Sequence, residues 1–213
     1  MSKVAIKGNA SGTGTFTLEA PNSNTDRTLT LPDEAGTVLT SGTDVANFPS
    51  GFANGITQAD QWRLATNVTP PASNNTYFLG SNLERNDGTQ FNYIGSGMSR
   101  SGEDFTFPET GIYWVTSTIT FRRSSGTGFS RENFNRILVS TNGGSTYTTV
   151  TNTAGAIYAD TNTCVTASTF IDVTNTTNIK VKFGYRTDST SVDIMGDSAQ
   201  NRTILTFIRL GDT

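Results

Sequence analysis

The sequence contains no histidine, a single cysteine and no long run of apolar residues. Without histidine the chain lacks the base of Ser-His and Cys-His catalytic dyads and the imidazole ligands of many metal sites. The one cysteine, Cys164, excludes an intrachain disulfide, and its place inside an expected strand predicts a small, buried and unreactive side chain. No segment is apolar enough to cross a bilayer, and no signal-peptide core follows the first lysines. We therefore expect a chain that is neither inserted in a membrane nor exported by the general route.

Charge is also scarce in this sequence. Charged residues make up 15% of the chain, and the net charge is -3 at pH 7. Lys and Arg occur singly rather than in clusters, so the sequence lacks the basic patch that binds a phosphate backbone. We expect no nucleic-acid partner.

The sequence is rich in Gly, Thr, Ser and Asn, which surround short runs of Val, Ile, Phe, Tyr and Leu. Branched and aromatic side chains suit a pleated sheet, and Gly and Asn supply the positive φ of tight turns. This pattern predicts an all-β sandwich or jelly roll of ten strands with few helices. The expected strands are 60–66, 76–79, 91–96, 103–107, 111–121, 135–140, 146–151, 164–173, 178–186 and 202–210.

The chain divides by composition into an N-terminal β segment (1–47), a Gly- and Pro-containing linker (48–57) and a body (58–213). The N-terminal segment holds short alternating strands with too few apolar side chains for a core of their own. We expect them to lean on other copies of the segment or on a surface to which they attach. The candidate attachment residues are Phe16, Leu18, Leu29, Leu31, Val38 and Leu39.

The last strand of the body differs from its neighbours. Most strands alternate apolar and polar side chains, as 178–186 does, which is typical of one buried and one wet face. In 202–210 apolar residues face both ways: Ile204, Ile208 and Leu210 on one side, Leu205 and Phe207 on the other. A strand that is apolar on both faces has a second burial partner, either a covering loop or another subunit.

Several motifs resemble one family. The stretch FTFPETGIYWVTSTITF, with Phe107-Pro108, Gly111 and Tyr113, resembles the globular head of the complement q-subcomponent and tumour necrosis factor (TNF) superfamily. WRLATN, SNLERND, IGSGMSRSG and RTILTFIRL are similar to a version of this head met in bacteriophage and marine microbial proteins. The resemblance covers 58–213. It implies a trimeric jelly roll with Trp62 and Trp114 as structural anchors. The implied trimer-interface residues are Tyr113, Ile204, Leu205, Phe207, Ile208 and Leu210.

A second resemblance concerns the N-terminal segment. GNASGTGTFTLEAPNSNTDRTLTLPDEAGTVLTS resembles a module of phage tail-fibre and virion-appendage proteins. Together the two resemblances imply a homotrimeric phage virion protein, made in the host cytoplasm and displayed on the virion surface. Its N-terminal segment would contact tail, baseplate or capsid proteins. Its head would contact a host glycan or protein, with Tyr158 as the candidate receptor contact.

Two alternatives remain open at this stage: a capsid decoration or cement protein of the same fold, and a carbohydrate-degrading appendage enzyme. Enzymatic glycoside cleavage needs a pair of carboxylates. The candidate acids Asp33/Glu34, Glu103/Asp104 and those of the 188–197 loop lie in solvated loop contexts, so we predict no catalytic residues and no enzyme. The 188–197 loop lacks the spacing of the twelve-residue calcium loop. We predict no metal site and no cofactor.

Overall fold

The computed structural model describes residues 11–15, 17, 23–26, 28, 55–86, 92–123 and 125–213. The chain divides into two units, Met1–Thr43 and Asp44–Thr213, and every described strand lies in the second unit. We call this second unit the head. The candidate attachment residues Phe16, Leu18, Leu29, Leu31, Val38 and Leu39 lie outside the described residues.

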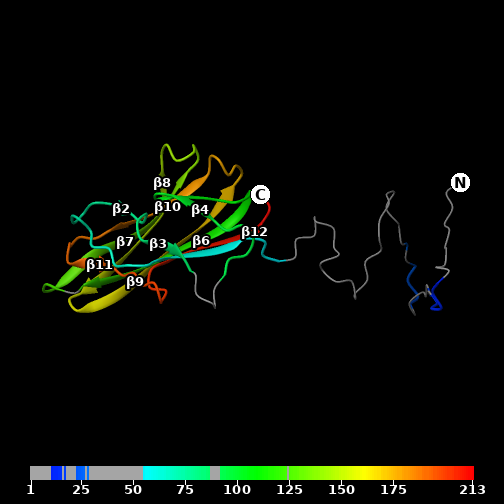
Figure 1. Cartoon of the computed structure of the whole chain (residues 1–213), viewed down its shortest axis with the longest axis horizontal. Helices are drawn as coiled ribbons and strands as arrows, with labels where there is room; N and C mark the ends of the chain where they lie inside the picture. Colours follow the sequence, from blue (N-terminus) through cyan, green and yellow to red (C-terminus); the bar gives the residue numbers. More distant parts are fainter. Residues whose placement is uncertain are drawn as a thin grey trace. The chain divides into compact units, whose positions relative to one another are not determined.

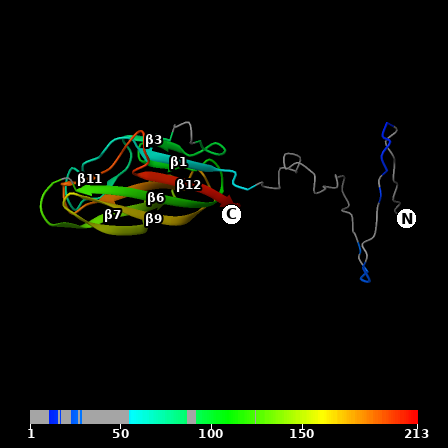
Figure 2. The ribbon, with the colours of Figure 1, turned by 90° about the horizontal axis from the view of Figure 1, so that it is seen from below.

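The head consists of two antiparallel sheets. The first runs in the order β9 (Thr161–Val173), β6 (Gly111–Arg123), β12 (Ile204–Gly211), β1 (Ala59–Leu64) and β3 (Leu83–Arg85), with β11 (Val192–Ile194) on the last residues of β6 (Figure 2). The second runs in the order β8 (Thr148–Tyr158), β7 (Phe129–Ser140), β10 (Lys180–Arg186), β5 (Asp104–Thr106) and β4 (Ser99–Ser101), with β2 (Tyr77–Phe78) also on β10. The predicted all-β jelly roll is confirmed.

Nine of the ten expected strands have a counterpart in the structure. The expected strand 91–96 has none, and this prediction is wrong. Residues 92–98 form a turn with a single bridge between Ile94 and Ala59, because Gly95 and Gly97 both take positive φ. A Cβ on Gly97 would lie 2.9 Å from side-chain atoms of both Arg85 and Asp60. Three strands, β3, β4 and β11, were not expected. Each has only three residues, which is too short for a visible alternation.

The core lies between the sheets and is dominated by aromatic rings. Phe105 of β5, Phe183 of β10 and Phe207 of β12 are fully buried, and their ring centres lie 5.2 to 5.7 Å apart. They join sheet to sheet at the separations that aromatic pairs prefer. The inward alternation expected for 178–186 is also present, since Val181, Phe183 and Tyr185 are buried.

The head has two distinct ends, fixed by strand register. At one end β1 begins beside the end of β12, where Ala59 pairs with Ile208, and the C-terminus follows (Figure 1). At the other end Arg123, the last residue of β6, pairs with Thr161, the first residue of β9. We call these the proximal and distal ends. β1 begins and β12 ends proximally, and the β6–β7 loop and the β8–β9 turn lie distally.

The buried Tyr113 predicts a loss of stability at alkaline pH. Its hydroxyl donates to the Glu109 carbonyl at 3.1 Å, and burial, followed by the charge of Glu109, raises the pKa of Tyr113 to about 12. In the unfolded chain tyrosine ionises near pH 10. The contribution of this group is therefore complete below about pH 10 and is lost as pH rises toward 12, by about 3 kcal/mol in total. Urea unfolding at pH 8, 10 and 11.5 should show Tyr113→Phe losing less stability on alkalinisation than the wild type. Equal losses would contradict this.

Candidate subunit interface and distal tip

The outer face of the first sheet carries an exposed apolar patch near the proximal end. Trp114 of β6 lies in register with Phe170 of β9 on one side and with Ile208 of β12 on the other. Trp114 is 44% exposed and Phe170 69% exposed, and the half-buried Ile112 and Ile208 lie beside them. We call Ile112, Trp114, Phe170 and Ile208 the apolar patch. Large side chains gathered on one sheet face indicate a surface that another molecule covers.

Toward the distal end the same face is lined by hydroxyl groups. Thr118 and Thr166 form a cross-strand hydrogen bond of 3.0 Å, and Thr120 Oγ1 lies 3.3 Å from Cys164 Sγ. Cys164 is exposed, so the expectation of a buried thiol is wrong. Its side chain alternates outward with Thr166, whereas Val165 and Ala167 fill the core.

The structure separates the six candidate interface residues into two groups. Ile204 and Ile208 are half-buried on the outer face, and Leu210 is 54% exposed. Tyr113, Leu205 and Phe207 are at most 1% exposed and lie inside the sandwich, so their side chains are part of the subunit's own core rather than of a contact surface.

The structure also corrects the role expected for Trp114. This side chain was expected to be a structural anchor, yet it lies on the outer face of the sheet. The alternation in β6 indicates the direction of Trp114, because the buried residues Tyr113, Val115, Ile119 and Phe121 all occupy odd positions. Even positions of the strand, including 114, must then point outward.

A second candidate surface is the edge strand β8, which has no described strand hydrogen-bonded on its outer side in its own sheet, although Thr151 Oγ1 donates to the Ser168 carbonyl of β9 at 3.3 Å. Among the described strands it pairs with β7 alone, and its sequence, TTVTNTAGAIY, contains no charged residue. Val150 is 48% exposed, and Ala154 and Ala156 are also exposed. Long edge strands normally carry charge, Pro or a covering segment that prevents pairing with other chains. The neutral edge of β8 therefore indicates a further site of contact.

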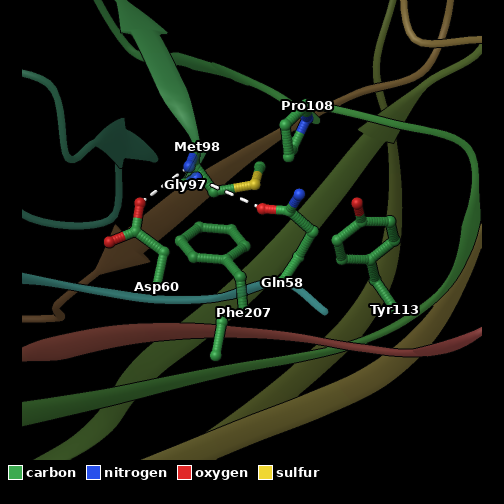
Figure 3. A pocket seen from close by; sticks show the side chains of 8 residues that line it. Gln58, Asp60, Gly97, Met98, Pro108, Tyr113 and Phe207 are labelled. Atoms are coloured by element: carbon green, nitrogen blue, oxygen red, sulfur yellow. Dashed lines mark hydrogen bonds between the residues drawn. The ribbon is translucent and has the colours of Figure 1, made fainter. Parts of the chain in front are cut away.

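A buried polar cluster holds the turn of residues 92–98, which we call the proximal turn, in place. The Asp60 carboxylate accepts bonds from Trp62 Nε1 at 3.0 Å, from Met98 N at 2.7 Å and from two nitrogens of Arg85 at 3.0 to 3.2 Å. Gln58 Oε1 accepts from the backbone of residues 96 and 97. Figure 3 shows both side chains pointing at this turn, beside the small hollow that Phe207 also lines. Gln58 Oε1 and the Asp60 carboxylate are thus bound within the chain, so the cluster's role is structural.

The distal end presents two exposed rings. Phe129, the first residue of β7, lies in register with Tyr158, the last residue of β8. Their ring centres are 4.9 Å apart and the planes meet at 66°. Phe129 is 66% exposed and Tyr158 is 51% exposed. The structure thus places Tyr158 at an exposed tip, and it adds Phe129, which no pattern in the local sequence indicates.

The acidic side chains of the 188–197 loop make separate local contacts. Asp188 accepts from Ser130 Oγ and the Arg131 backbone, and Asp193 accepts from Thr69 Oγ1 at 2.6 Å. Asp197 bonds to the turn at 199–200 and to Arg202. Within the described ranges no group of three or more His, Cys, Asp or Glu side chains is placed to hold a metal ion. The same part of the chain contains no helix that could span a membrane.

The order of the strands and the packing of the two sheets define a TNF-like jelly roll. The chain is similar to murine APRIL at pH 5.0, with a TM-score of 0.50 and 12% identity over 72% of this chain and 98% of that one. It is also similar to Eiger TNF from S. frugiperda (TM-score 0.47, 15% identity, 73% and 93% covered) and to PRD1 vertex protein P5 (0.43, 15%, 74% and 99%). No family model and no curated protein matches the chain. At this identity the likeness shows the fold alone.

Proposed function

We propose that this protein is a bacteriophage virion structural protein, a homotrimeric fibre or spike displayed on tail or capsid, whose head contacts the host surface. The observation that carries the proposal is the apolar patch on the outer face of the first sheet. Phe170 and Trp114 expose large rings at paired positions of a well-packed sandwich, and burying them against another subunit is favourable in proportion to the apolar area removed from water.

In a ring of three subunits, each contact joins two different surfaces, whereas a two-fold dimer joins the same surface on both chains. Each chain of a trimer must therefore offer two contact surfaces. The head offers both. The apolar patch supplies one surface, and the neutral edge strand β8 supplies the other. In the proposed trimer the patch of each subunit packs against the β8 edge of the next, so that no neutral edge is left open to pairing with other chains.

The virion role rests on the resemblance of residues 8–41 to phage tail-fibre modules. An attachment made through residues 1–47 joins the head at its proximal end, where β1 begins. The β6–β7 loop and the β8–β9 turn, at the other end of β6, are then free to face the host. Three heads per trimer raise the avidity of shallow contacts without any new interaction.

Deletion of residues 1–47 tests the attachment. We expect the truncated protein to fold and trimerise but to be missing from phage particles, as judged by antibody labelling of virions in electron micrographs. Labelling of the full-length protein also places it on tail or capsid. Incorporation of the truncated protein at wild-type levels would refute the attachment role.

Competition for adsorption tests the host contact. Purified full-length protein should slow the adsorption of the phage that carries it. If it does not, and particles lacking the protein have unstable shells, the protein is a capsid cement protein. Release of reducing sugar from host envelope material would instead identify an appendage enzyme.

A further inference from the structure

The aromatic pair at the distal end has the form of a built binding site. Both rings are more than half exposed, yet they hold each other edge to face with centres 4.9 Å apart. Each ring stands at the end of a long strand, Phe129 at the start of β7 and Tyr158 at the end of β8. Exposed apolar rings held on strand ends form a rigid surface, because strands position side chains more firmly than loops do.

A buried arginine fixes the loop that leads into Phe129. Arg123 is only 8% exposed, and its guanidinium donates to the carbonyl oxygens of Ser125, Thr127 and Gly128 at 3.1 to 3.2 Å. Gly126 and Gly128 take the positive φ that this closed loop requires. Since all three bonds go to backbone atoms, Arg123 shapes the loop rather than pairing with a charge.

The β8–β9 turn is tied to the same loop. Ala159 N donates to the Gly128 carbonyl at 3.2 Å, and Asp160 N donates to the Arg123 carbonyl at 2.9 Å. The two segments that carry the rings are therefore joined by backbone hydrogen bonds. A preorganised site loses less conformational entropy when it binds a ligand.

The chemistry of the tip fits a neutral sugar ring. Aromatic faces stack on the apolar C–H face of a pyranose, while hydroxyl, amide and carboxylate groups bond to its hydroxyls. Exposed polar residues of the two adjoining turns, Ser125, Thr127 and Asp160, supply such groups, and so does Asn162 near the start of β9. Two rings with a polar surround are too small for the core of a stable protein contact, which buries about 800 Å² on each partner.

We propose that Phe129 and Tyr158 form a binding site for a neutral saccharide at the distal tip of each head. This inference rests on the proposed host contact and names its chemical class. One sugar ring stacks on an aromatic face, and the adjoining turns hydrogen-bond its hydroxyls. Three copies in a trimer bind a repetitive surface polysaccharide far more tightly than one site binds a single sugar.

Saturation-transfer NMR on the full-length protein tests the site, with the methyl glycosides of glucose, galactose, mannose and N-acetylglucosamine as probes. We expect transfer to at least one of them. The double variant F129A/Y158A should bind that sugar about tenfold or more weakly, as for the loss of a central aromatic contact. The matched swap F129Y/Y158F keeps two rings and should keep binding. Y93A, which removes a ring that is 40% exposed elsewhere, should also keep it.

Three results would overturn the inference. They are no transfer from the wild type to any of the four sugars, equal transfer from F129A/Y158A, and a smaller assembly mass for that variant, which would show that a second copy of the chain covers the rings. Adsorption competition separates this inference from the proposed function. A protein that competes with phage but binds no sugar refutes the saccharide site and leaves the host contact standing. A protein that binds sugar but does not compete with phage refutes the host contact and leaves the saccharide site standing.

Discussion

Replacing Phe170 by Glu is expected to convert the assembled protein into monomers. In the single chain Phe170 is 69% exposed, so a charged side chain at this position leaves the subunit fold intact. In the proposed trimer the same carboxylate would be buried beside Trp114 with no cationic partner, which costs several kcal/mol at each contact, on the order of the 3–5 kcal/mol of a broken buried pair. Light scattering should give about three times the 22.8 kDa chain mass for the wild type and the mass of one chain for the variant.

Phe129→Glu is the matched control for this experiment. Phe129 is 66% exposed, almost as much as Phe170, but it lies at the distal tip. The same change in chemistry should leave the mass at three chains and the circular dichroism spectrum unchanged. A wild-type protein that is monomeric at micromolar concentration, or a Phe170→Glu variant that stays trimeric, would contradict the proposed interface.

The edge strand distinguishes a ring from a two-fold dimer. If the patch meets the β8 edge of the next subunit, Val150→Lys should also dissociate the assembly, since it introduces a charge at the opposite side of the same contact. If two patches meet face to face, the wild type has twice the chain mass and Val150→Lys has no effect.

Sequence periodicity predicted the sandwich because each long strand packs one face. In β10 the apolar residues Val181, Phe183 and Tyr185 alternate with Lys and Arg, and the structure buries them as expected. The same reasoning assigned two apolar faces to β12, and the structure shows Leu205 in the core and Ile208 on the outer face. A pattern of period two predicts the buried face reliably, because side chains alternate strictly between the two faces of a strand.

The interface residues were harder to assign, because alternation says which residues share a face but not which face is inside. Tyr113 and Trp114 are adjacent and both aromatic, so one of them must point inward and the other outward. The resemblance pointed to Tyr113 as an interface residue, and the structure places it in the core. In the sequence, Val115, Ile119 and Phe121 share the face of Tyr113, whereas mainly threonines share the face of Trp114, and this difference indicates which side is inside.

The Asp60 cluster could not be predicted from local sequence. Its members come from β1, β3 and the proximal turn, and Asp60 is 25 residues from Arg85 and 38 from Met98. A lone Asp next to a Trp in a strand has the same local appearance whether it is solvated or buried. Only the folded arrangement of these three segments shows that the carboxylate has no access to water.

Asp60→Ala should strongly destabilise the head. The side chain of Asp60 is 2% exposed, and its removal leaves the Arg85 guanidinium, the Met98 amide and the Trp62 indole without their shared acceptor. Breaking a buried pair by removing one partner costs about 3–5 kcal/mol, which is a large part of the ~5–15 kcal/mol that stabilises a typical domain. Urea unfolding at pH 7 and equal chain concentration measures the loss.

Two further variants show how much of the lost stability comes from burial of the Asp60 charge and how much comes from losing any ion pair. Glu132→Ala removes the 53%-exposed partner of Arg186, and because solvent screens this surface pair, the loss should stay below about 1 kcal/mol. Asp60→Asn keeps an acceptor for Met98 N but removes the charge that faces Arg85, so its loss should lie between the other two. A loss for Asp60→Ala no greater than that for Glu132→Ala would show that the cluster does not stabilise the head. The expected order instead follows from burial, since the Asp60 side chain is 2% exposed whereas that of Glu132 is 53% exposed.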